Sequence, residues 1–283
     1  MGPYSLVPTM QCYHHVVSMK HQVTGSIEID EKDIIELKEG SIGYTEKDWG
    51  RNFPEIWIWG QSNHWNKDDR ETSLFFSFAM IPWYFNLKFP GFLVIFYYNQ
   101  TFYRFTTYSQ SFVHRLMIDE TNQRISFNLY DQLFKYKLRV ILTYQHQSSS
   151  IAPKANLYGP RNGKMEKFVN EILTNASFDV RFSKLIQDQT AFISDDEDDE
   201  VKLFSQHGIY ENVLYQAKAD PVALEITGNV SWLSEQLHST YGNSYPWTFS
   251  LTRVLMEMII YIKNSYITMI LVTVFTLLVI FRR

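Results

Sequence analysis

Acidic and aromatic side chains alternate along one short stretch of the sequence, YTEKDWGRNFPEIWIWGQSNHW, which begins at Tyr44. A β-strand directs successive side chains to opposite faces, so Tyr44, Glu46 and Asp48 share one face of a strand. Lys47 and Trp49 point to the other face. Two carboxyl groups beside a phenol would form a polar, titratable centre on that strand.

The same rule applies to the strand expected at 55–65, after the turn bracketed by Gly50 and Pro54. One face carries indole and carboxamide groups, from Trp57, Trp59, Gln61, Asn63 and Trp65. The opposite face carries small and aliphatic side chains typical of ordinary packing: Ile56, Ile58, Gly60, Ser62 and His64. Aromatic walls with a few fixed polar groups are typical of ligand pockets. The pattern therefore predicts an aromatic cavity with acids beside it.

A structural role for the acids is the alternative at this point. Glu46 or Asp48 would then lie on a charged rim and pair with Lys47, Arg51 or another base. Parity alone favours this structural interpretation.

The elements that must position these residues are short β-strands. From Gln11 to about Asn229, alternating aromatic and β-branched segments are broken by turn signals. We predict strands at 11–19, 21–30, 33–38, 41–48, 55–65, 71–81, 91–98, 101–108, 111–119, 123–131, 133–144, 176–186, 208–216 and 222–230. Hairpin turns are expected at Asn99–Gln100 and at 119–123. Many short strands favour an all-β, antiparallel barrel or sandwich.

Two helical segments are expected within this β domain. GKMEKFVNEILT follows Asn162–Gly163 and spaces its apolar residues as in a helix, at Met165, Phe168, Val169, Ile172 and Leu173. This segment would form a plug or lid on the sheet. A second short helix is expected within 231–248, followed by a linker.

An apolar segment ends the sequence. Ser265 to Phe281 contains no charged residue, and 17 helical residues span about 25 Å of a hydrocarbon core of roughly 30 Å. Extension back through MIIYIKN gives a predicted transmembrane helix at 258–281. The β domain would occupy 1–232, and a linker with a juxtamembrane segment would occupy 233–257. Without a recognisable signal peptide, we expect a cytosolic β domain with a single-pass C-terminal anchor.

Composition argues against several classes of partner. The 283 residues carry a net charge of −4 with mixed signs, which disfavours nucleic acid. The single cysteine, Cys12, excludes an internal disulfide framework and a Cys-based zinc site. The adjacent His14 and His15 would face opposite sides of a strand, so no shared metal ion is expected.

The stretch EKDWGRNFPEIWIWGQSN resembles the signature of the tocopherol cyclase family. Its matching positions are Glu46, Lys47, Trp49, Gly50, Phe53, Pro54, Trp57, Trp59, Gln61 and Asn63. Weaker similarity appears in MGPYSLVPTMQCYH, LYGPRNGKM and VALEITGNVSWL, so the resemblance covers roughly residues 1–233. Family members have a further β-rich stretch before the region corresponding to Met1. The resemblance implies a lipocalin-like barrel.

The resemblance also implies a reaction, the closure of a chromanol ring on a prenylated quinol without metal or redox cofactor. An acid protonates the alkene nearest the ring, and the phenol oxygen captures the tertiary cation. Such a site needs a carboxylic acid kept protonated by an apolar setting, and aromatic faces near the cation. It must also exclude water, which competes as a nucleophile.

These requirements assign roles by residue type. Glu46 or Asp48 would be the acid, and Trp57 and Trp59 the cation-facing rings. Gln61 and Asn63 would hold the phenol, and Tyr44 and Trp49 would complete the substrate site. The alkyl chain would lie along 74–85 and 92–105.

The expected partner is thus a hydrophobic prenylated aromatic lipid, reached from the membrane through the anchor. Two other functions stay open. One is a non-catalytic lipid or pigment carrier with the same barrel, since a fold does not fix a function. The other is a membrane-displayed β-sandwich whose exposed tryptophans recognise a protein or glycan.

Overall fold

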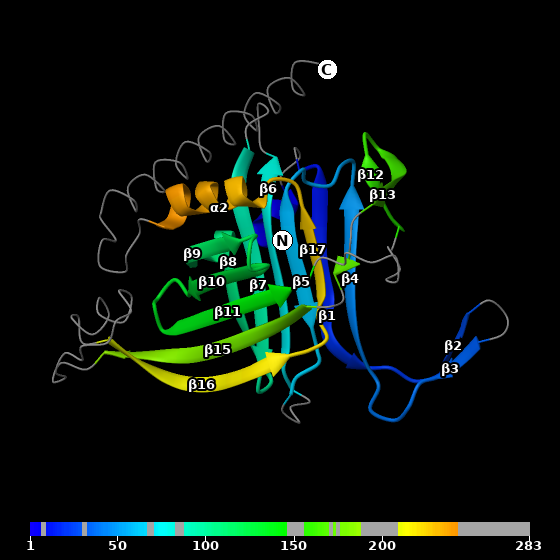
Figure 1. Ribbon diagram of the computed structural model, residues 1–283, viewed down its shortest axis with the longest axis horizontal. Helices are drawn as coiled ribbons and strands as arrows, with labels where there is room; N and C mark the ends of the chain where they lie inside the picture. The colour runs from blue at the N-terminus through cyan, green and yellow to red at the C-terminus, as the bar shows by residue number, and fades with distance from the viewer. Residues whose placement is uncertain are drawn as a thin grey trace, which may run out of the picture. The chain divides into compact units, whose positions relative to one another are not determined.

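The computed structural model describes residues 1–6, 10–29, 33–66, 71–82, 88–145, 156–169, 172–173, 176–187 and 209–242. All of them belong to one compact unit, residues 1–243. Its centre is a pair of antiparallel sheets whose strands cross at a steep angle (Figure 1).

The larger sheet has six strands in the order β14-β17-β5-β6-β7-β8. Their bounds are Ile172–Leu173, Ala223–Thr227, Trp57–Ser62, Ser73–Pro82, Lys88–Tyr98 and Thr101–Thr106. The second sheet has five strands in the order β16-β15-β11-β10-β9. Their bounds are Ile209–Ala219, Ala176–Gln187, Tyr136–Tyr144, Arg124–Tyr130 and Phe112–Asp119.

Three two-stranded ladders complete the β structure. They pair β1 (Cys12–Gln22) with β4 (Ile42–Gly50), β2 (Ser26–Ile29) with β3 (Asp33–Glu36), and β12 (Asn156–Arg161) with β13 (Lys164–Val169). Short helical segments lie at η1 (Gly2–Leu6), η3 (Thr107–Ser109), α2 (Val230–Leu237) and η4 (His238–Gly242).

The core lies between the two large sheets and is built largely of phenylalanine. Phe76 and Phe78 of β6 meet Phe127 of β10 with ring centroids 5.2 Å and 4.9 Å apart. Phe178 of β15 lies 5.3 Å from Phe76, and all four rings are buried. Aromatic edge-to-face and tilted contacts of this kind stabilise a core beyond simple area burial.

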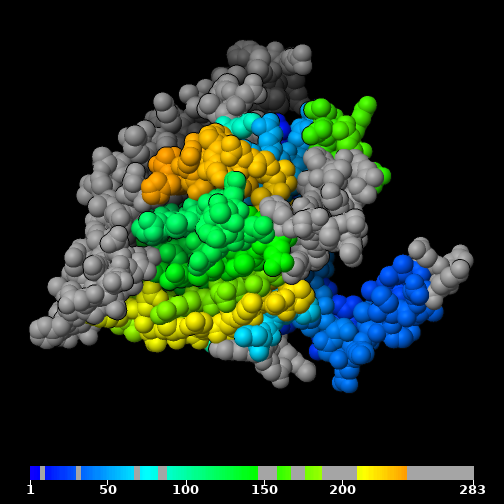
Figure 2. Space-filling view, in the orientation of Figure 1, coloured from blue at the N-terminus to red at the C-terminus, as the bar shows by residue number. Residues whose placement is uncertain are grey.

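Helix α2 closes one margin of this core. Asn229 caps the helix by accepting a hydrogen bond from the Trp232 backbone N–H at 2.9 Å. Val230, Leu233 and Leu237 then point inward and are buried. Figure 2 shows the helix lying along the edge of the five-stranded sheet. The short helix predicted after Ser231 is thereby confirmed.

The helix predicted after Gly163 is wrong, because that segment forms the second strand of the β12–β13 hairpin. Asn162 and Gly163 have φ angles of 52° and 78°, the left-handed pair that a two-residue hairpin turn requires. Arg161 and Lys164 pair directly across it. The apolar residues at helical spacing are therefore divided between β13 and β14.

The predicted hairpin at Asn99–Gln100 has the same turn chemistry, with φ angles of 47° and 59°. Tyr98 pairs with Thr101 across the turn, and Asp119 pairs with Arg124 across the second predicted hairpin loop. Both predictions are confirmed.

The all-β antiparallel class is confirmed, but the described strands form no closed barrel. The hydrogen-bonded order of the six-stranded sheet runs from β14 to β8 without returning to its first strand. Within the described residues, no helix has both the length and the hydrophobicity to cross a bilayer. The predicted span 258–281 lies outside them.

The β1–β4 ladder forms a third layer, on the face of the six-stranded sheet opposite the core. His14 of β1 stacks on Phe75 of β6 with ring centroids 5.0 Å apart, and Tyr44 of β4 stacks on the same ring at 6.3 Å. At the far end, Ser73 Oγ donates to the Met19 carbonyl at 3.0 Å. These contacts hold β4 above β5 and β6, which is where the candidate site lies.

Candidate active site

Strand parity on β4 places Glu46 at the centre of the site. Its Oε2 accepts hydrogen bonds from the Tyr44 hydroxyl and from Trp59 Nε1, the latter at 3.1 Å. The Glu46 side chain is only 15% exposed. Among the described residues, neither Glu46 nor Asp48 pairs with a lysine or arginine, so the pairing expected with Lys47 or Arg51 is not observed, and the base that both acids contact is His14.

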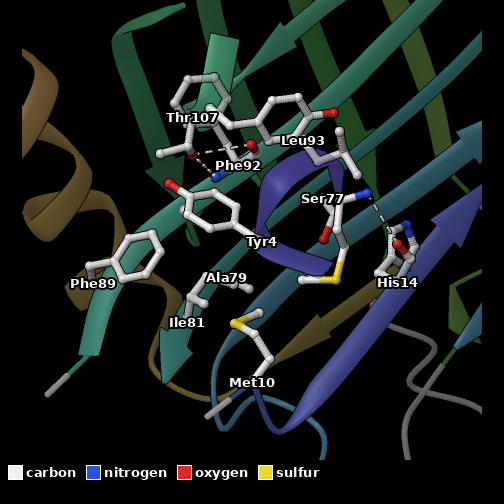
Figure 3. Close-up of a pocket in the computed structure, with 13 residues that line it drawn as sticks. Tyr4, Met10, His14, Ser77, Ala79, Ile81, Phe89, Phe92, Leu93 and Thr107 are labelled. Atoms are coloured by element: carbon white, nitrogen blue, oxygen red, sulfur yellow. Dashed lines mark hydrogen bonds between the residues drawn. The ribbon is translucent and has the colours of Figure 1, made fainter. Parts of the chain in front are cut away.

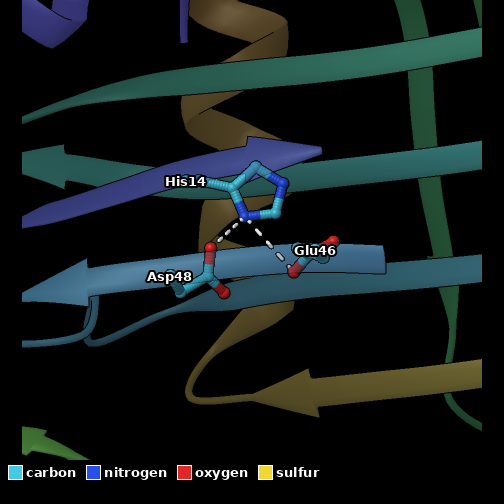
Figure 4. Close-up of side chains that lie close together, drawn as sticks. All are labelled: His14, Glu46 and Asp48. Carbon is cyan, nitrogen blue, oxygen red and sulfur yellow. Dashed lines mark hydrogen bonds and ion pairs between the residues drawn. The ribbon is translucent and has the colours of Figure 1, made fainter. Parts of the chain in front are cut away.

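His14 joins the two acids from the neighbouring strand. The antiparallel register sets His14 opposite Asp48 and Val16 opposite Glu46. Nδ1 of His14 lies 2.6 Å from Asp48 Oδ1 and 3.4 Å from Glu46 Oε1 (Figure 4). These three donor atoms lie close enough together to hold a divalent cation. In the structure, His14 Nδ1 contacts both carboxyl groups.

The acids open into a cleft of about 440 Å³ between the β1–β4 ladder and the six-stranded sheet. Its lining residues are Met1, Cys12, His14, Tyr44, Glu46, Asp48, Phe53, Pro54, Trp57, Trp59, Ser77, Ala79, Ile81, Tyr158 and Glu225. This size and mixture, large aromatic walls with few polar groups, are typical of a site for a small organic ligand.

A second indole and a third carboxyl group lie on the floor of this cleft. Strand β17 pairs with β5 so that Glu225 stands opposite Trp59. Trp57 Nε1 donates to Glu225 Oε2 at 3.0 Å. The indole N–H groups of Trp57 and Trp59 thus each fix one glutamate.

Burial sets the electrostatics of the site. It raises the pKa of Glu46 to about 7, aided by the negative charge of Asp48 and opposed by His14 and by the two hydrogen bonds. Burial also raises the pKa of Glu225, and raises the pKa values of the Tyr44 hydroxyl and the Cys12 thiol. Glu46 can therefore carry a proton near neutral pH while it faces aromatic walls.

The β12–β13 hairpin borders the cleft in place of the helix predicted there. It is fixed to the loop after Gly50 by backbone bonds from Phe53 N to Pro160 O at 3.1 Å and from Gly163 N to Arg51 O at 2.9 Å. Tyr158 of β12 lines the cleft and is 64% exposed.

Several predicted site residues do not line this cleft. Trp49 lies on the other face of β4 and stacks on Tyr13, with ring centroids 5.5 Å apart. Asn63 is buried, and its Nδ2 lies 3.5 Å from the Gly43 carbonyl. Gln61 is also absent from the lining, and its buried Nε2 has no hydrogen-bond partner among the described residues.

The parity prediction is wrong for Trp65, which does not share the face of Trp57 and Trp59. Strand β5 ends at Ser62, and the alternation stops there. The Trp65 ring then packs on the core side, 5.7 Å from Tyr215, and its Nε1 donates to the Thr72 carbonyl at 2.9 Å.

His14 and Glu225 are titratable residues of the cleft that the sequence patterns do not assign to the site. From the sequence, His14 is weighed only as a metal ligand, and Glu225 lies in the strand predicted at 222–230 without a functional role. Strand parity is the signal that indicates Glu225. Leu224 and Ile226 face the core, so Glu225 between them faces the opposite side of the sheet. Its pairing with β5 is long-range and cannot be read from a local pattern.

The fold and cleft thus define an all-β protein with a protonatable acid in an aromatic site. A family model described as tocopherol cyclase-like matches residues 2–151, which include β1, β4, β5, Glu46 and Asp48. The chain belongs to this tocopherol cyclase-like family. No curated protein and no solved structure matches the chain.

Proposed function

We propose that the protein closes a chromanol ring on a prenylated quinol, with Glu46 as the proton donor. The observation that carries this proposal is the setting of Glu46, a buried carboxyl group fixed by a phenol and an indole inside an aromatic cleft. Membership of the family supports the same reaction class.

The geometry supports a specific order of events. Protonated Glu46 gives its proton to the less substituted alkene carbon, and the cation that forms lies near the faces of Trp57 and Trp59. The phenol oxygen of the same molecule then captures the tertiary cation. Because the two groups belong to one molecule, the capture is intramolecular in any case, and the cleft contributes the orientation, which is part of the roughly 7–11 kcal/mol by which a well-oriented intramolecular reaction can lower a barrier.

The His14–Asp48 pair has a supporting role in this proposal. His14 lies between Asp48 and Glu46, so it connects the buried donor to a side chain that is 29% exposed. Through this pair, Glu46 can recover a proton from solvent after each turnover.

The experiment that tests the function uses the full chain and a prenylated trimethylbenzoquinol in deuterated water. We expect a chroman of the same composition that carries one deuterium at the former alkene carbon, measured by chromatography and mass spectrometry. Saturable binding of the quinol without conversion would instead identify a lipid carrier and reject the cyclase proposal.

The alkyl chain of the substrate has a defined path in this proposal. A small apolar cavity of about 70 Å³ shares Ser77, Ala79 and Ile81 with the cleft. It continues beneath Tyr4 of η1 toward Phe89 of β7 (Figure 3). The β6 and β7 side chains that line the small cavity support the predicted role of these strands in chain binding, while Phe76 and Phe78 belong to the core.

Filling the junction between the two cavities tests this path. In Ala79→Phe, the added ring is expected to weaken binding of a long-chain prenylated quinol at least about tenfold, because buried methylene groups each contribute roughly 0.8 kcal/mol. Binding of trimethylhydroquinone, which has no chain, should change little in the same fluorescence titration. Ser126→Phe, on the outer face of β10, is the matched control. Equal weakening of both ligands would contradict the path.

A further inference from the structure

Glu225 is a partly buried carboxyl group with no cationic partner within ion-pair distance among the described residues. A buried carboxyl group is normally paired or well hydrogen-bonded, because an unsatisfied one is costly. Its described side-chain partner is the Trp57 indole N–H, which bonds one of its two oxygens.

The hydrogen bonding of Glu225 leaves one oxygen available to a ligand. Oε2 accepts the Trp57 N–H at 3.0 Å. Oε1 accepts no hydrogen bond from the described residues, and Glu225 lines the 440 Å³ cleft. A carboxylate can accept several hydrogen bonds, so a donor on a ligand in the cleft would satisfy this oxygen.

Glu46 and Glu225 are presented to the cleft in matching ways. Each has one oxygen fixed by an indole N–H from alternate positions of β5. Glu46 comes from β4 in the layer above the sheet, and Glu225 comes from β17 beside β5. The cleft therefore holds two carboxyl groups that approach a ligand from different elements.

We propose that Glu225 binds the attacking phenol hydroxyl of the substrate and accepts its proton during ring closure. This inference rests on the proposed function and replaces the roles first expected for Gln61 and Asn63. Its chemical requirement is a free hydroxyl on the aromatic ring, positioned within reach of Glu225 Oε1.

The reaction balances with these two groups alone. Glu46 loses a proton as the alkene π electrons form the new C–H bond. A lone pair of the phenol oxygen forms the C–O bond to the tertiary cation, and the phenol O–H bond breaks as its proton passes to the Glu225 carboxylate. Exchange of one proton through water then restores both groups.

The surroundings of Glu225 suit a proton acceptor. Burial raises its pKa, and the negative charge of Asp48 acts in the same direction, while the Trp57 hydrogen bond and His14 oppose them. A raised pKa makes the carboxylate a stronger base than an exposed glutamate.

Two measurements on Glu225→Gln in the full chain test the assignment. Wild type is expected to bind trimethylhydroquinone about tenfold more tightly than its dimethyl ether, as is typical of a hydrogen bond to a charged group. The variant should lose this preference. With a prenylated quinol, kcat should fall by about a hundredfold, and KM should rise by up to about tenfold because the hydrogen bond to the phenol is lost. Glu55→Gln, an exposed acid beside the cleft, is the control and should match wild type.

The outcomes separate this inference from the proposed function. If wild type cyclises the quinol and E225Q matches its kcat and ligand preference, the role of Glu225 is overturned and the cyclase proposal stands. If wild type prefers the free phenol but does not cyclise the quinol, and E225Q lacks that preference, phenol binding by Glu225 is supported and the cyclase proposal fails. If E225Q melts at a lower temperature than wild type, Glu225→Met takes its place in the same ligand comparison.

Discussion

Replacing Glu46 with glutamine is expected to lower the turnover of a prenylated benzoquinol by roughly 100-fold to 10,000-fold, the usual contribution of a positioned acid. The amide keeps the shape of the side chain but has no proton to give the alkene. Binding should persist, because Trp57, Trp59 and the apolar wall are unchanged. Initial rates at saturating quinol, together with a binding titration, check this result.

The pH dependence gives this prediction a second readout. Because the pKa of Glu46 is raised to about 7, wild-type turnover should decline as pH rises through 7 and the carboxyl group ionises. A raised carboxyl pKa in the folded state means that stability is greatest below the unfolded value and decreases as pH rises toward 7. E46Q removes the buried charge, so its melting temperature at pH 8 should equal or exceed that of wild type.

Asp48→Asn is the matched control for the choice of acid. Asp48 is more exposed than Glu46, and its described partner is His14. We expect a smaller loss of turnover in D48N than in E46Q. A larger loss in D48N, with E46Q near wild type, would transfer the donor role to Asp48.

Gly50→Ala is expected to cause the largest structural change, a loss of about 3 kcal/mol in the free energy of unfolding together with most of the activity. Gly50 has a φ of +154°, and a Cβ there would lie 2.0 Å from the Gln11 backbone oxygen. The backbone must move to relieve this contact. Because Gly50 pairs with Cys12 at the end of the β1–β4 ladder, the movement would separate His14 from Asp48.

Gly25→Ala separates the steric effect of an added Cβ from the effect of a positive φ angle. Gly25 also has a positive φ, +113°, but a Cβ there would meet no atom within 4 Å. Chemical denaturation of both variants should show a much smaller loss for G25A, with turnover retained. Equal losses in the two variants would show that backbone conformation alone accounts for the effect.

Local patterns in the sequence were sufficient for most of the strands, but not for β12, β13 and β14, and for part of the site. Alternation on one strand depends only on the two-residue period of β structure, so Tyr44, Glu46 and Asp48 could be grouped without coordinates. The same rule grouped Trp57 and Trp59. It failed at Trp65 because the period holds only while the strand continues, and β5 ends at Ser62.

The helix predicted after Gly163 shows a different limit. Apolar spacing in a short segment suits a helix and a pair of strands almost equally. The left-handed Asn162–Gly163 turn decided between them, because it brings Arg161 and Lys164 together as a hairpin.

Sequence alone determined that this protein is an antiparallel β structure of a recognisable family with acids and indoles on single strand faces. Only the tertiary structure decided which faces meet. His14 reaches Asp48 through the β1–β4 register, and Glu225 reaches Trp57 from a strand 168 residues away along the chain. Pairing between distant strands depends on how whole sheets pack, and no local period encodes it.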